Sequence, residues 1–257
     1  MSSPTPSASP PVLRAVYGID VPPGRPLDAD EVATAYPWPE GTWVRAMMVT
    51  TLDGAAAGPD GLSGSVSSTA DRAVFDAVRR FADAVLVGSH TLRAEEYSPM
   101  RAKPADAERR RAAGQLPAPT LAVVSGSLDL PWELPVWAES AQRPLVLTGA
   151  GADAGRLAAA REHAEVVVLP EVSPRGIVDA LAGCGLPRIV CEGGPNLLRD
   201  LVAARMVDEA DITVSPVFAG TGQSPTTAVL PEVVRADLVH LLAADGFLMA
   251  RYLIGPR

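Results

Sequence analysis

A carboxylate followed by two glycines ends a short apolar run in the sequence RIVCEGGPNLL, residues 188–198. The run 189–191 predicts a buried strand, and Pro195 favours the first turn of a following helix, where a missing N–H costs nothing. Glycines let the backbone approach a ligand closely, and a helix start favours an anion. The stretch therefore predicts a turn that faces a phosphate, with Glu192 at the start of the turn. An ordinary structural turn would use the same residues.

Other residues of this chain have types that suit catalysis or anion binding. Glu192 ends a buried strand, where a charged side chain is costly unless it has a role. Asp53 follows the apolar strand 43–51 and is either a functional acid or a turn residue. Lys103 is the sole lysine, so cationic roles fall to arginine. A guanidinium suits bidentate binding of phosphate or carboxylate.

The composition argues against several other classes of protein. A net charge of −8 disfavours general binding to nucleic acid or to an acidic membrane. Cys184 and Cys191 lack C-x-x-C spacing, and His90, His163 and His240 form no ligand-spaced set, so we expect no disulfide framework and no metal site. No apolar run approaches the roughly 20 residues of a spanning helix, and no signal peptide is recognisable. We expect a soluble cytoplasmic protein.

The pattern of strands and helices predicts an α/β protein. Residues 1–11 read as a disordered tail because they are rich in Ser and Pro, and 12–257 as a single domain. Strands are expected at 43–51, 84–87, 120–124, 145–147, 166–169, 189–191, 210–217, 238–242 and 247–254. Helices are expected at 28–35, 69–81, 89–95, 103–114 (charged and exposed), from 153, at 174–182 and at 196–205.

This order predicts a mixed sheet that is mostly parallel and ends in an antiparallel hairpin across Ala244-Asp245-Gly246. The alternation of the strand 43–51 places Arg45, Met47 and Val49 on one face. Ligands of such sheets bind beyond the carboxyl ends of the parallel strands. Those ends carry polar or glycine-rich turns here, so we expect the site at that edge.

Several separated stretches resemble, in order, the motifs of one family. They are TLDG at 51–54 (S-L-D-G), AVLVGSHTL at 84–92 (A-I-L-V-G-x-x-T-V), VCEGGP at 190–195 (V-E-G-G-P), and MVDE at 206–209 with VSP at 214–216 (L-V-D-E and A-P). Over 42–255 the chain resembles the C-terminal reductase domain of the bifunctional riboflavin biosynthesis protein. That resemblance implies a dihydrofolate-reductase-like fold with helices on both faces of the sheet, commonly as a homodimer. The P-C-x-x-C motif of the deaminase half is absent from the sequence, and the H-x-E at 163–165 is not followed by it, so no deaminase activity is expected.

The resemblance implies an NADPH-dependent reductase that transfers hydride to the ribosyl C1′ of 5-amino-6-(5-phosphoribosylamino)uracil. The positions that match the family's cofactor site are Val49, Thr91, Glu95, Gly193, Gly194, Pro195, Asn196, Leu197 and Leu198. Those that match its substrate site are Ser63, Arg79, Arg101 and Glu192. The candidate catalytic acids are Glu192, Glu95 and Asp53. The rate of hydride transfer depends mainly on how the substrate is positioned against the nicotinamide. A carboxyl group whose pKa is raised would supply the proton.

The chain departs from the family's pattern at several positions. Met47 stands where the family commonly has Lys or Arg, and Arg45 is an imperfect substitute about 7 Å away along the strand. Ser65 replaces an aromatic residue, and 95–97 replaces D-D-P. These departures leave two alternatives open, a reductase of this fold that acts on a pterin or another small substrate, and a non-catalytic nucleotide-binding module.

Overall fold

The computed structural model describes residues 11–95, 97–220 and 230–255, so nearly all of the predicted tail lies outside the described residues. The strands are β1 Arg14–Tyr17, β2 Trp43–Thr50, β3 Ala84–Gly88, β4 Thr120–Val124, β5 Leu145–Gly149, β6 Glu165–Leu169, β7 Arg188–Cys191, β8 Glu209–Val214, β9 Ala236–Ala244 and β10 Phe247–Ile254. The helices are α1 Ala29–Ala35, α2 Thr69–Arg79, α3 Ser89–Glu95, α4 Pro104–Ala112, α5 Pro135–Glu139, α6 Ala154–His163, α7 Pro174–Gly183 and α8 Pro195–Ala203, with a 3-10 turn at Ser63–Ser65.

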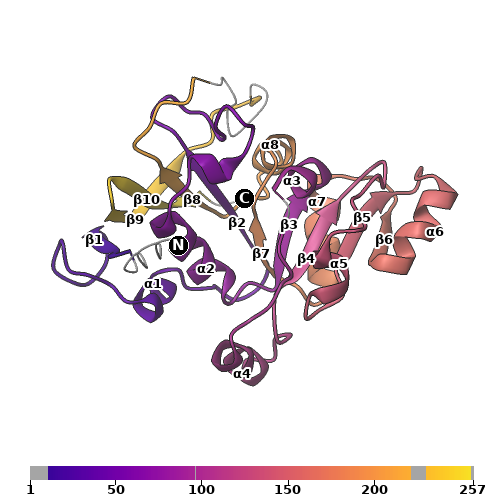
Figure 1. Ribbon diagram of the computed structural model, residues 1–257, viewed down its shortest axis with the longest axis horizontal. Coiled ribbons are helices and arrows are strands. Elements are labelled where there is room, and N and C mark those ends of the chain that lie inside the picture. Colours follow the sequence, from indigo (N-terminus) through magenta and orange to yellow (C-terminus); the bar gives the residue numbers. More distant parts are fainter. Residues whose placement is uncertain (1–10, 96, 221–229, 256–257) are drawn as a thin grey trace, which may run out of the picture.

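These strands form one mixed sheet in the order β1-β9-β10-β8-β2-β7-β3-β4-β5-β6 (Figure 1). Neighbours from β8 to β6 run parallel, whereas β10 is antiparallel to β8 and β9, and β9 to β1. The predicted fold class is confirmed. The predicted hairpin turn is present too, because Asp245 and Gly246 both have positive φ (51° and 84°), as a two-residue turn between twisted strands requires.

Helices cover both faces of the sheet. On one face α7 and α8 pack on Val44, Ala46 and Leu86. On the other, α1 and α2 pack on Met47 at the antiparallel half, and α3, α5 and α6 cover Val87 at the parallel half. The predicted alternation of β2 is therefore confirmed, since consecutive residues join different cores. Two elements, β1 and α5, were not predicted.

Helix α4 is exposed over most of its length, as expected of a charged helix, but one of its faces is buried. Asp106, Ala107 and Arg110 are buried, and Arg110 is fully covered. Its guanidinium donates to the carbonyl oxygens of Ala82 at 2.6 Å and Leu116 at 2.8 Å. The charge pattern gave no sign of this burial because the partners are backbone oxygens from distant turns.

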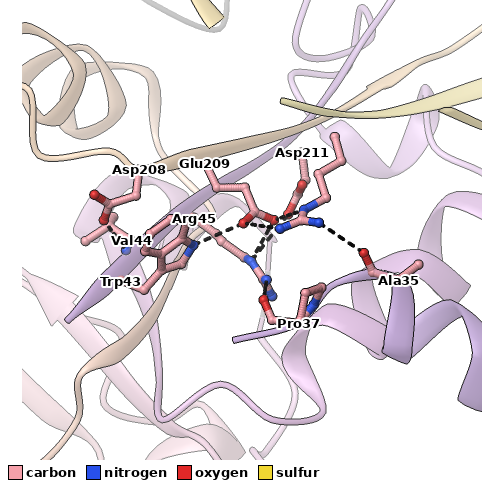
Figure 2. Close-up of polar contacts among 9 residues, drawn as sticks. Ala35, Pro37, Trp43, Val44, Arg45, Asp208, Glu209 and Asp211 are labelled. Carbon is pink, nitrogen blue, oxygen red and sulfur yellow. Dashed lines mark hydrogen bonds and ion pairs between the residues drawn. The ribbon is translucent and has the colours of Figure 1, made fainter. Parts of the chain in front are cut away.

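A buried ionic network joins the parallel and antiparallel halves (Figure 2). Glu209 Oε1 lies 2.8 Å from Nε of both Arg45 and Arg251, and Oε2 accepts from Trp43 Nε1 at 3.0 Å. Arg45 is fully buried, stacks 4.0 Å over the Trp38 ring, and does not line the cavity described below. Arg45 therefore does not substitute for the family's cation at Met47.

Two further titratable groups belong to this network. Burial and the charge of Glu209 raise the pKa of Asp211 well above its ordinary value. Burial and the nearby Arg251 lower the pKa of His240 to about 4. The His240 ring packs edge-on against Tyr36, with ring centroids 4.7 Å apart. At neutral pH His240 is therefore an uncharged core residue.

Glu209→Gln should destabilise the protein by about 3–5 kcal/mol, because two buried guanidinium groups would lose their counter-charge. Urea unfolding followed by circular dichroism measures the change. Glu139→Gln is the matched control, since Glu139 pairs with Arg101 where both side chains are more than half exposed. That change should cost less than about 1 kcal/mol. Equal effects at the two positions would show that the network does not hold the halves together.

The pKa of His240 predicts a loss of stability in acid. The pKa of His240 in the folded protein lies below the ordinary value of 6.5. The stability that the neutral ring contributes is therefore fully present above pH 6.5 and is lost as the pH falls toward 4. Between those values the wild type should lose about 3 kcal/mol more than His240→Phe, which keeps a ring beside Tyr36. Urea unfolding at several pH values measures the difference, and parallel curves for the two proteins would contradict the prediction.

Candidate functional site

A cavity of about 1610 Å³ lies at the carboxyl ends of the central parallel strands, between α2, α3 and the start of α8. This is the predicted edge of the sheet. The sequence-predicted residues that line it are Val49, Ser63, Arg79, Thr91, Glu95, Arg101, Glu192, Gly194, Pro195 and Asn196. Asp53, Gly193, Leu197 and Leu198 do not line it. Most of the predicted site is therefore gathered around one space.

The glycines bring the ends of β3 and β7 into contact. Gly88 N donates to Gly193 O at 2.8 Å. Gly193 has φ of 94°, which favours glycine, and the Gly193–Gly194 peptide bond is cis. A Cβ on Gly194 would lie 2.6 Å from Thr91 Oγ1. The turn thus presses its backbone against the first turn of α3, and only glycine fits at 194 without a shift.

Helix α8 begins at this turn and directs its positive end at the cavity. Gly194 is the N-cap, Pro195 is the first residue, and the first helical bond runs from Leu198 N to Gly194 O at 3.0 Å. The amides of such a first turn have no intrahelical acceptor. The Leu198 side chain is buried in the core and Leu197 packs against it, so a ligand would meet these residues through the backbone.

Glu192 is held by a cation and a phenol. Its Oε1 accepts from Arg79 Nε at 2.5 Å, and its Oε2 accepts from Arg79 Nη2 at 2.5 Å and from the Tyr97 hydroxyl at 2.9 Å. Burial lowers the pKa of Arg79, but the charge and hydrogen bonds of Glu192 outweigh it and hold that pKa above its ordinary value. Burial and then the Glu192 charge raise the pKa of Tyr97. No motif or spacing in the sequence indicates that Tyr97 would be a partner of Glu192.

The remaining predicted substrate residues lie at the rim. Glu95 Oε1 accepts from Ser63 N at 2.8 Å and so ties the loop before α2 to the end of α3. Arg101 donates to Glu139 Oε2 at 2.8 Å, and both side chains are largely exposed. Residue 96, the middle of the D-D-P counterpart, lies outside the described residues. The rim thus combines a loop–helix contact with an exposed cation.

Asp53 lies outside the cavity and organises a turn. Its Oδ2 accepts from Gly220 N at 2.7 Å, its Oδ1 from Ala219 N at 3.2 Å, and it also binds the Thr51 hydroxyl. The Thr51 hydrogen bond first, and then these amides, lower the pKa of Asp53 to about 2. The carboxylate therefore ties the end of β2 to the segment after β8, which favours the turn interpretation over that of an acid.

Comparison with known proteins decides the family. The model of the RibD C-terminal domain matches residues 42–246. The chain belongs to the RibD C-terminal domain family. This membership confirms the resemblance seen in the sequence motifs. It also identifies the glycine turn and the Glu192 site as parts of a family domain.

Individual relatives agree with this family. The chain is similar to the 2,5-diamino-6-ribosylamino-4(3H)-pyrimidinone 5′-phosphate reductase of Archaeoglobus fulgidus, at 28% identity over 72% of this chain and 84% of the relative. It is similar to the riboflavin biosynthesis protein RibD of Mycobacterium tuberculosis, at 29% identity over 74% of this chain and 45% of the relative. It thus spans less than half of that relative.

A solved structure shows the same fold. The pyrimidine reductase-like protein of Corynebacterium diphtheriae superposes with a TM-score of 0.75, at 24% identity over 84% of this chain and 93% of that chain. Within the described residues, no helix is long and apolar enough to cross a membrane. Those residues also contain no group of three or more potential metal ligands.

The packing of Gly194 on Thr91 can be tested by a double-mutant cycle. Gly194→Ala should cost about 1–3 kcal/mol, because its Cβ would overlap Thr91 Oγ1. Adding Thr91→Ala removes that oxygen, so the double variant should be no less stable than Thr91→Ala alone. Thermal unfolding measures all three. Gly126→Ala, whose Cβ would meet nothing within 4 Å, is the control. Additive losses would refute the contact as the cause.

Proposed function

We propose that the protein is an NADPH-dependent reductase of riboflavin biosynthesis that acts on a phosphorylated ribosylaminopyrimidine. The observation that carries the proposal is one cavity with a glycine turn and helix start on one wall and the Arg79–Glu192 pair on another. The reductase of Archaeoglobus fulgidus and the riboflavin biosynthesis protein of Mycobacterium tuberculosis, to which the chain is similar, support it. The substrate is the uracil predicted from the sequence or its 2-amino counterpart.

The residues at the glycine turn fit a dinucleotide phosphate. Gly194 has no side chain where one would fill the space beside Thr91. Pro195 and Asn196 line the cavity at the positive end of α8, which favours an anion. Thr91 would contribute its hydroxyl and Val49 an apolar contact to the nicotinamide. When bound, NADPH supplies the hydride that reduces the substrate.

The arginines fit the substrate phosphate. Glu192 uses Nε and Nη2 of Arg79, and a guanidinium has further N–H groups for a second anion. Glu192 thereby fixes the orientation of Arg79 while leaving it cationic. Arg101 lines the same cavity near the rim and would add a second positive charge. A phosphate held at this end would place the ribosyl C1′ deeper in the cavity, toward β2.

Reduction at C1′ breaks the bond to the ring oxygen O4′, which then takes a proton. A carboxylate that accepts bonds from Arg79 and Tyr97 is bound as an anion, so Glu192 suits the positive charge that develops at C1′ better than it suits proton donation. Glu95, whose bound oxygen accepts only a backbone amide, is the better placed acid of the two. A cytoplasmic location and a homodimer accompany this proposal, and light scattering tests the second.

NADPH oxidation with each pyrimidine substrate, and with dihydrofolate for comparison, tests the function. Turnover of a ribosylaminopyrimidine phosphate supports the proposal, while turnover of dihydrofolate alone, or no NADPH binding, contradicts it. Glu192→Gln should lower kcat about 100-fold or more, because it removes a charge that acts in the transition state. Arg79→Ala should raise KM and, since it also frees Glu192, lower kcat less strongly. An unchanged kcat in Glu192→Gln would exclude Glu192 from catalysis.

A further inference from the structure

Asp71, near the start of α2, is a buried carboxyl group in the wall of the cavity. The residue is 2% exposed and lines the same space as Arg79 and Glu192. Its Oδ2 accepts from the Ser67 hydroxyl at 2.7 Å, whereas its Oδ1 has no hydrogen-bond partner within the described part of the chain. Buried polar atoms normally have partners, because an unmade hydrogen bond is costly. A ligand with an N–H donor would supply the hydrogen bond that Oδ1 lacks.

Asp71 differs from the other carboxyl groups of the cavity lining that are not exposed to solvent. Glu192 is paired with Arg79, Asp106 with Arg80, and Glu95 accepts a backbone amide. Burial has the largest effect on the pKa of Asp71 and raises it, while hydrogen bonds with the Thr213 and Ser67 hydroxyls and the charge of Arg72 lower it. Within the described residues, no cation pairs with Asp71 through a salt bridge.

The position of Asp71 on α2 assigns it to one end of the substrate. Asp71 precedes Arg79 by eight residues, which is about 12 Å along the helix axis. If the phosphate binds at Arg79, the far end of the substrate reaches Asp71. The ribosylamino group is attached to C6 of the pyrimidine, so the ring edge opposite to it, C2–N3–C4, is the part that points away from the phosphate.

The two candidate substrates differ at that edge. In 2,5-diamino-6-ribosylamino-4(3H)-pyrimidinone the 2-amino group and N3–H are adjacent donors, which match the two oxygens of a carboxylate. In the uracil, C2 carries a carbonyl oxygen, which a carboxylate oxygen would repel. Resting on the proposed function, we propose that Asp71 pairs with the 2-amino group and N3–H and so selects the 2-aminopyrimidinone over the uracil.

Oδ1 is covered in the structure, so pairing requires a neighbouring side chain to shift. Met47 lies on the β2 face that packs against α2, and it lines the cavity. An unbranched methionine changes rotamer at low cost. A Lys or Arg at this position would bring a cation close to α2. Because Met47 carries no charge, it does not pair with Asp71. The Asp71 carboxyl group therefore remains available to a neutral ring with N–H donors.

Asp71→Asn tests the selection because the amide reverses one hydrogen bond and keeps the shape. Its NH2 would donate to the C2 carbonyl of the uracil while its oxygen still accepts N3–H. We expect wild type to favour the 2-aminopyrimidinone phosphate in kcat/KM, and the variant to lose roughly 10- to 100-fold with it while losing little with the uracil. Asp179→Asn is the control, an exposed carboxylate on α7 that does not line the cavity, and should leave both values unchanged.

The wild type provides a second measurement that does not depend on the folding of a variant. A protonated carboxyl group donates one bond and therefore accepts the uracil edge, so the preference for the 2-aminopyrimidinone should rise with pH and should be pH-independent in Asp71→Asn. A wild-type preference for the uracil, or an equal loss with both substrates, would overturn the role of Asp71. If wild type reduces neither compound, the proposed function fails. Calorimetric binding of the two compounds then still decides whether Asp71 discriminates between them.

Discussion

The pairing of Glu209 with two buried arginines fixes how the halves of the sheet meet. Arg45 comes from β2, Glu209 from β8 and Arg251 from β10, so one carboxylate connects a parallel pair and an antiparallel pair. Burying these charges is costly, and their mutual attraction, the bond from Trp43 and the bonds from the arginines to the carbonyl oxygens of Pro37 and Ala35 offset the cost. A shift of register by one residue would separate them. The network therefore sets the register that places Met47 and Val49 at the cavity.

The functional edge depends on a different constraint, the absence of side chains. Strands β3 and β7 are neighbours, and the bond from Gly88 to Gly193 continues their contact beyond the last strand residues. Thr91 occupies the space where a side chain at Gly194 would be. The start of α8 can then reach the cavity with its backbone. The wall that we propose for the cofactor phosphate is thus made of close backbone packing, and Arg79 and Glu192 line the same cavity.

The sequence predicted the elements whose signals are local. Helix α3 and strand β10 have the predicted bounds, and Asp28 caps α1 through a capping box, as an acidic helix start suggests. Strand β1 was missed because four mostly exposed residues carry little periodicity. Helix α5 was missed because one short turn of helix has no repeat to detect.

Long-range polar partners could not be predicted either. Arg110 binds carbonyl oxygens and Tyr97 binds Glu192 across 95 residues of chain. Side-chain type alone does not reveal such partners, because they depend on how turns far apart in sequence pack. Asp53 is the converse case, in which the structure shows a local role. A motif position suggested chemistry, and the fold uses the carboxylate to hold a turn.

Glu192 and Asp71 show how one cavity gives two carboxyl groups different properties. Glu192 faces Arg79, so its charge is compensated by an ion pair at the end of the cavity where we propose that the substrate phosphate binds. Asp71 lies at the other end of α2 among hydroxyl and apolar groups, where burial disfavours its charge. A ligand that brings two N–H donors compensates that charge on binding. The cost of burying Asp71 without a cation is thereby converted into selectivity for the ring that supplies both donors.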